Sequence, residues 1–165
     1  MNWLLATPLV LPFLTAVVAF LSRTKPAGRW FSVAGNVLFL AAAIALLMAV
    51  LQDGVIAGQM GGWSAPFGIT LVADRLSAVM VVITAITALA VSIYALSDIN
   101  ERKEYLGYHA LFNILIGGVT GAFITGDLFN LYVWFEVMLI SSFGLLVLGG
   151  SKAQIDGGVK YVTLN

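Results

Sequence analysis

Residues 126–140 read GDLFNLYVWFEVMLI, and the window Leu128–Gly149 that begins in this stretch contains one charged residue, Glu136. The window is close to the ~20 residues that an α-helix needs to cross a bilayer. At ~1.5 Å of rise per residue, Glu136 lies roughly 13 Å past Asp127, near the centre of a ~30 Å hydrocarbon layer. The stretch therefore predicts a membrane-spanning helix with a carboxyl group at mid-depth.

A carboxylate at this depth is costly, by about 2.5–3.5 kcal/mol on insertion scales. Residues of this kind usually face a bundle interior or a water-filled path, and they often handle protons or ions. Tyr132 lies one helical turn earlier and is placed to hydrogen-bond with the carboxyl group of Glu136. The alternative is a neutral carboxylic acid with a structural role. Because the cost is high, the sequence favours a role for Glu136 in transport.

Composition places the chain among membrane proteins. Its 165 residues are 61% hydrophobic and 10% charged, with a mean hydropathy of +1.01, whereas soluble domains carry about 25% charged residues. A net charge of zero gives no reason to expect a nucleic-acid partner. The chain has no cysteine and one histidine, which excludes thiolate ligands and a multi-histidine zinc site within it. No cofactor, metal or covalent catalysis is expected.

The fold class predicted is an all-α membrane protein, a polytopic transmembrane helix bundle formed by residues 1–165 as one unit. Apolar windows of nearly spanning length or longer predict five complete helices and the start of a sixth. Strands are disfavoured because they need only ~9–11 residues to span and would alternate apolar and polar residues. The expected helices cover about residues 2–22, 30–51, 76–97, 108–125, 128–149 and, incomplete, 153–165.

The connections between these windows predict the orientation. Lysine and arginine gather in the first, third and fifth connections, whereas the opposite side holds one basic residue, Arg75. Because positive loops stay in the cytoplasm, the N-terminus is expected outside the cell. On that outer side, the connection 52–75 carries glycine, proline and aromatic residues, which predict a short hairpin at the membrane surface.

Other polar residues have competing interpretations. Asp127 follows a glycine between two windows and is expected to cap the fifth helix, with a role in admitting ions as the alternative. On the fourth helix, His109, Asn113 and Thr120 fall within ~40° of one another. This stripe would either join neighbouring helices or form one wall of a hydrated proton path. Lys160 would either extend to the interface or serve as the inner cation of a charge relay.

The stretch Thr125–Ser142, together with Gly149-Gly150 and Gly158–Tyr161, resembles the D subunit of the multisubunit Mrp-type sodium/proton antiporters. The outer segments 61–69 and 74–77 are similar as well. The resemblance runs through all 165 residues, which correspond to roughly the first third of such a subunit. The last apolar segment also falls short of the ~20 residues needed to span, so we expect the chain to be incomplete and inactive alone.

The resemblance implies a mechanism. This family shares ancestry with the antiporter-like subunits of respiratory complex I, and in both a glutamate on the fifth helix pairs with a lysine on the seventh. Glu136 matches that glutamate, and Lys160 matches a lysine at the start of the sixth helix. The seventh helix is not in this sequence. Complex I subunits often carry a proline soon after the glutamate, where this chain has Ser141-Ser142-Phe143-Gly144, which favours the Mrp type.

Three functions follow from these observations. The first is an ion-translocating subunit of a cation/proton antiporter, not an enzyme, multi-pass in a bacterial plasma membrane. Its partners would be other antiporter subunits, the lipid bilayer, protons and monovalent cations, with Na⁺ expected. The second is a proton-pumping subunit of a redox complex of the complex I or membrane hydrogenase type. The third is a membrane scaffold that transports nothing.

Overall fold

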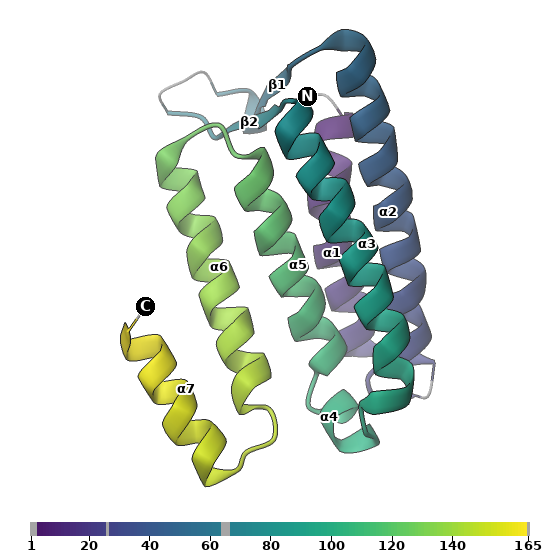
Figure 1. Ribbon diagram of the computed structural model, residues 1–165, viewed down its shortest axis with the longest axis vertical. Coiled ribbons are helices and arrows are strands. Elements are labelled where there is room, and N and C mark those ends of the chain that lie inside the picture. The colour runs from purple at the N-terminus through teal and green to yellow at the C-terminus, as the bar shows by residue number, and fades with distance from the viewer. Residues whose placement is uncertain (1–2, 26, 64–66, 165) are drawn as a thin grey trace.

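The computed structural model describes residues 3–25, 27–63 and 67–164, in which long helices run up and down side by side (Figure 1). The expectations for Met1, Asn2 and Asn165, and for the tip of the outer connection at 64–66, lie outside these residues. The elements are α1 (Trp3–Leu21), α2 (Gly28–Asp53), β1 (Ile56–Gln59), η1 (Met60–Gly62), β2 (Thr70–Ala73), α3 (Arg75–Asp98), α4 (Glu101–Tyr105), α5 (Tyr108–Ile124), α6 (Leu128–Val147) and α7 (Lys152–Leu164).

The helical membrane fold is confirmed. Among the described residues, α1, α2, α3 and α6 are long and apolar enough to cross a membrane, and α5 is a shorter apolar helix of 17 residues. At ~1.5 Å per residue, α5 is still about 25 Å long and nearly matches the hydrocarbon layer. The protein is therefore a multi-pass membrane protein.

The core lies among α1, α2, α3 and α5, where side chains such as Phe39, Leu46 and Ile116 are buried together. Helix α6 packs on α5 at the edge of this group, and α7 packs on α6 (Figure 1). Small residues allow the close approaches, since a Cβ atom on Gly35 would collide with the Thr15 side chain of α1. Such small-residue contacts are typical of membrane helices, whose packing lacks a hydrophobic driving force.

Two helices, α2 and α6, differ from the sequence prediction by two residues at a boundary. Helix α2 runs two residues further at each end than the window 30–51, because polar residues at a helix end can extend into the interface. Helix α6 ends at Val147 instead of 149, and Gly150 adopts a positive φ of 69° in the turn that follows. Helix α4 was not predicted. Asn100 caps it by accepting a hydrogen bond from the backbone N–H of Lys103 at 3.0 Å.

The predicted outer hairpin is present. Strands β1 and β2 pair antiparallel, with Ile56 opposite Ala73 and Gln59 opposite Thr70. Leu71 of β2 also forms an isolated bridge with Thr125, which lies between α5 and α6. The hairpin therefore ties the connection before α6 to the rest of the bundle.

The basic connections lie together at the end of the bundle opposite the hairpin (Figure 1). This end contains the α1–α2 connection, α4 and the α6–α7 connection. The arrangement agrees with the alternation expected from the sequence. Which end faces the cytoplasm stays a prediction.

Candidate functional site around Glu136 and the α2–α5 interface

Asp127 sets the start of the helix that carries Glu136. Its Oδ1 accepts a hydrogen bond from the backbone N–H of Asn130 at 2.6 Å, which satisfies one of the free donors of the first turn. The Asn130 amide in turn donates to the Thr125 hydroxyl at 2.8 Å. Asp127 is therefore the N-cap of α6, as predicted.

Helix α6 contacts α5 along one face and leaves Glu136 on another. The contacting face is close-packed, since a Cβ atom on Gly121 of α5 would collide with the Trp134 indole ring. A Cβ atom on Gly118 of α5 would likewise collide with the Met138 side chain. Glu136 is only partly buried.

Two cavities meet at Glu136. One, of about 370 Å³, lies between α6 and α7 and is lined by Leu139, Phe143, Val159 and other apolar side chains. The other, of about 480 Å³, also contains Tyr132 and Ser142. The phenol of Tyr132 lies one helical turn from Glu136 and lines the same cavity. The carboxyl group therefore borders space large enough for water or for another side chain.

Helix α6 also carries an aromatic stripe on the face of Glu136, formed by Phe129, Tyr132 and Phe143, and this stripe is mostly exposed. Phe129 and Tyr132 are 78% and 62% exposed. Phe143 is the exception, because it contacts α7 at Gly158. Among the described residues, this stripe does not form the packed interface that is typical of such patterns.

Lys160 does not approach Glu136. Helix α7 meets α6 through Gly158, which is buried, and through Tyr161, whose hydroxyl lies 3.1 Å from that of Ser142. At ~100° per residue, Lys160 points ~160° away from Gly158. Its side chain is exposed. The structure therefore places Lys160 on the side of α7 that faces away from α6.

The polar stripe of α5 faces α2 and is buried. Asn113 Nδ2 donates to Ser32 Oγ at 2.9 Å and to the His109 carbonyl at 2.7 Å. Its Oδ1 accepts from Asn36 Nδ2 at 3.2 Å. Thr120 is also fully buried, but its hydroxyl donates within α5 to the carbonyl of Ile116. The hydrogen bonds of Asn113 join two helices, as in the first of the two interpretations of the stripe.

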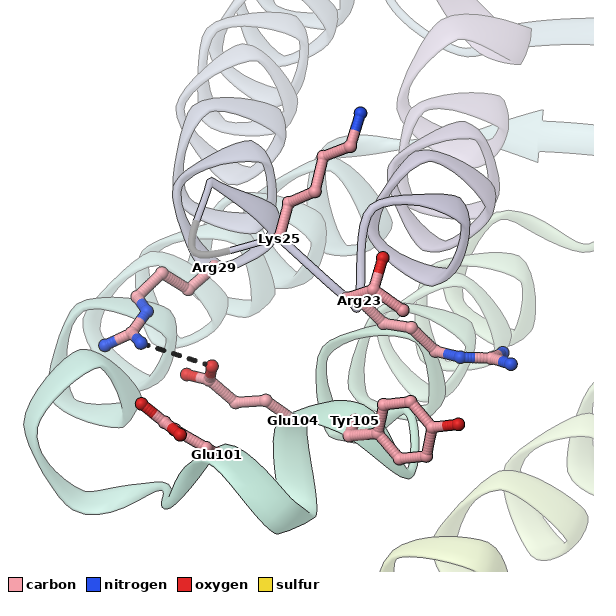
Figure 2. Close-up of a pocket in the computed structure, with 7 residues that line it drawn as sticks. Arg23, Lys25, Arg29, Glu101, Glu104 and Tyr105 are labelled. Atoms are coloured by element: carbon pink, nitrogen blue, oxygen red, sulfur yellow. Dashed lines mark ion pairs between the residues drawn. The ribbon is translucent and has the colours of Figure 1, made fainter.

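His109 belongs to a charged cluster that the sequence did not predict. The carboxylate of Glu104, on α4, lies 3.4 Å from the Arg29 guanidinium and 3.6 Å from His109 Nε2. A cavity of about 310 Å³ opens beside this cluster, lined also by Arg23, Lys25 and other residues (Figure 2). Because the three partners come from separate segments of the chain, no local spacing reveals the cluster.

The two polar regions lie on opposite sides of α5. Gly118, which contacts α6, is ~140° around the helix from Asn113, which contacts α2. The structure therefore does not bring His109, Asn113 or Thr120 to Glu136. Over the described ranges, no group of three or more histidine or acidic side chains is placed to hold a metal ion.

Comparisons with known proteins identify the relatives of the chain. It is 38% identical to the D subunit of the Na(+)/H(+) antiporter of Bacillus subtilis, over 100% of this chain and 34% of that protein. A Rhizobium meliloti protein, named as the probable D subunit of a K(+)/H(+) antiporter, is also 38% identical, over 100% of the chain and 32% of the relative. The chain thus spans about a third of the length of the curated relatives it matches. No protein-family model matches it.

Two solved structures share the fold. The Mrp complex of Dietzia aligns with a TM-score of 0.86 and 29% identity, over 99% of this chain and 32% of the other. The membrane-bound sulfane sulfur reductase, an archaeal respiratory membrane complex, aligns with a TM-score of 0.89 and 26% identity, over 96% and 33%. The resemblance found in the sequence is confirmed: along its whole length, this chain is similar to about a third of the D subunits of Na⁺/H⁺ antiporters, and its fold is similar to part of a solved Mrp complex.

Proposed function

We propose that this chain forms part of an ion-translocating subunit in a multisubunit cation/proton antiporter, and that Glu136 is its proton-exchanging group. The relatives named for antiport are transporter subunits and not enzymes. The exchanged cation in this proposal is Na⁺, and the location is a bacterial plasma membrane with the N-terminus outside. The partners are the other subunits of the complex.

The observation that carries the proposal is the position of Glu136. It lies in the middle of an otherwise uncharged helix, partly exposed, where two cavities meet. A carboxyl group buried for structure alone would be expected to have its oxygens satisfied by packed neighbours. Glu136 instead borders open space in two cavities, with Tyr132 one helical turn away as a polar neighbour. This geometry suits a group that gains and loses a proton.

The structure supports different roles for the other candidate residues in this proposal. His109 lies beside a cavity at the charged end of the bundle, which suits a place where protons are taken up. Asn113 acts as a helix contact in this proposal, because it hydrogen-bonds across the α2–α5 interface, and Thr120 acts as a buried packing residue whose hydroxyl bonds within α5. Lys160 remains a candidate cation only if its neighbourhood changes in the assembled complex. Asp127 acts as a cap.

The test uses the chain within its native complex, in everted membrane vesicles that carry an imposed pH gradient. Adding Na⁺ dissipates the gradient when antiport occurs, and a pH-sensitive dye reports the change. Glu136→Gln keeps shape and hydrogen bonding but removes titration, so exchange should be abolished while assembly is unchanged. Glu136→Asp keeps the acid but withdraws it by one methylene, so activity should fall only in part.

Asp53→Asn is the control, because it makes the same change from acid to amide in an exposed carboxylate at the end of α2, away from both polar regions. It should exchange ions at the wild-type rate. Replacing the Na⁺ pulse by K⁺ tests the cation. If Glu136→Gln assembles normally and still exchanges at the wild-type rate, the assignment of Glu136 is wrong.

A second candidate function is favoured by one observation, the alignment with a respiratory membrane complex. In that case the same helices would move protons only while electrons flow through partner subunits. Exchange driven by a Na⁺ gradient, with no electron donor and with respiration inhibited, supports the antiporter. Movement of protons that requires an electron donor supports the redox complex.

A further inference from the structure

An apolar groove of about 420 Å³ runs along the membrane-facing junction of α1 and α5. Alanine and glycine at its base leave the space between larger apolar side chains. The residues that line it are Phe13, Ala16, Val17, Phe20, Leu21, Leu106, Gly107, Ala110, Leu111 and Ile114. From Phe13 to Leu21 it follows α1 for about 12 Å at the helical rise.

A cation is held at the charged end of this groove. The Arg23 guanidinium carbon lies 3.9 Å from the centre of the Phe20 ring and 5.7 Å from that of Tyr105. Stacking on aromatic faces fixes the direction of an arginine side chain. Figure 2 shows Arg23 directed along Tyr105 and away from Glu104. The guanidinium group is therefore positioned above the groove by contacts with one of the groove's own residues.

Arg23 has no ion-pair partner in the part of the chain that the structure describes. Two carboxylates line the cavity beside it; Glu104 is engaged with Arg29 and His109, and Glu101 is not paired with Arg23. Arg23 thus lies at one end of a groove that has no charged lining residue, without an ion-pair partner in the described ranges.

We propose that this groove binds an anionic phospholipid, with one acyl chain between α1 and α5 and the headgroup phosphate at Arg23. The groove matches such a lipid in chemistry, because it is apolar along its length, like the acyl chain, and has a cation at one end, where the anionic headgroup would lie.

Photo-crosslinking distinguishes this site from ordinary contact with lipid. The purified chain is placed in vesicles that contain either phosphatidylglycerol or phosphatidylcholine with the same photoreactive acyl chain. Labelled residues are then located by mass spectrometry. Phosphatidylglycerol should label Val17 and Ile114 about fivefold more than phosphatidylcholine, the ratio that ~1 kcal/mol per basic residue corresponds to. Ile83, which is 50% exposed on α3, should show no preference.

Variants test the contribution of the Arg23 charge separately from the contribution of the apolar groove. Arg23→Gln should abolish the preference for phosphatidylglycerol, Arg23→Lys should retain it, and Lys152→Gln, which removes an exposed cation of α7, should leave it unchanged. Val17→Trp fills the groove from an exposed position, so labelling of Ile114 by both lipids should fall, unlike in Ile83→Trp. Circular dichroism checks that each variant is folded.

Two results would overturn the proposal. One is equal labelling of the groove by both lipids in the unmodified chain, or a preference that survives Arg23→Gln. The other comes from a photoreactive amino acid at position 17 in the native complex. Crosslinks there mainly to another protein would show that a partner protein covers the groove, whereas crosslinks mainly to lipid support the site.

Discussion

Asn113→Leu should destabilise the bundle by removing the hydrogen bonds that join α2 and α5. Asn113 is fully buried, and its amide makes two bonds across the interface, with Ser32 and Asn36. A third bond, to the carbonyl of His109, lies within α5. Leucine has a similar size and cannot replace any of them.

The magnitude follows from the two interhelical bonds. Hydrogen bonds between membrane helices contribute ~0.6 kcal/mol on average and at most ~1.7 kcal/mol each. Their joint loss should therefore cost about 1–3 kcal/mol. The Asn36 amide keeps its bond to the Ser32 carbonyl at 2.9 Å, which limits the loss on α2.

The assay is reversible unfolding of the purified chain in mixed micelles with increasing SDS, followed by circular dichroism. A double-mutant cycle with Ser32→Ala should give a coupling energy of roughly 0.6 kcal/mol, since the two residues share one bond. Thr87→Val is the control, because the Thr87 hydroxyl is exposed and bonds only within α3, to the carbonyl of Ile83. It should change stability by less than about 0.5 kcal/mol.

Strict additivity of Ser32→Ala and Asn113→Leu would refute this account of the interface. The same variant also separates the two interpretations of the α5 stripe. In the native complex, a helix contact predicts that Asn113→Leu lowers assembly, with the exchange rate per assembled complex preserved. A wall of a hydrated path predicts normal assembly with a lower rate per complex.

Three further predictions follow from the structure. Gly121→Ala should destabilise the α5–α6 pair by about 1–3 kcal/mol in the SDS assay, because the new Cβ would collide with the indole ring of Trp134 on α6. Gly157→Ala is the control and should be tolerated, since nothing lies within 4 Å of its Cβ position. Hydrogen bonds from Ser77, the third residue of α3, hold the pKa of the Asp74 carboxyl group below its usual 3.8. Asp74→Ala should therefore lower the thermal midpoint at neutral pH, and the difference should shrink as the pH falls from 3.8 through the lowered pKa. If the bundle has the predicted orientation, an impermeant thiol reagent should label a cysteine at Gly58 and not one at Lys25 in intact cells; the reverse pattern would contradict it.

The helices could be predicted from the sequence because the membrane makes length and hydropathy decisive. An apolar window of about 20 residues has few alternatives once every backbone group must be paired internally. The N-cap of α6 could also be predicted, since Asp127 accepts a hydrogen bond from a backbone N–H only three residues away. Helix α4 was not, because its five residues have no period to detect and its formation depends on the cap at Asn100.

The candidate site was predictable only in part, for a physical reason. Glu136 stands out because a single charge in an apolar window is costly wherever the helix packs. The partners of Asn113 could not be found in the same way, since they lie 77 and 81 residues away in the sequence. Asn36 was the one sequence signal for such a partner, as the only amide side chain in the largely apolar window 30–51. Its register against α5 depends on how two helices pack, which no local pattern determines.

The energetics of Glu136 indicate what the site still requires. A carboxylate facing lipid at this depth costs about 2.5–3.5 kcal/mol. Helix α7 places mostly apolar side chains, such as Val159 and Val162, along the cavity that it shares with Glu136, with Thr163 as a polar one. Water or a charged group would offset this cost more fully than these side chains do. In the proposed function, this charged group is a cation that approaches Glu136 from another part of the subunit or of the complex, and the two cavities at Glu136 provide the space for it.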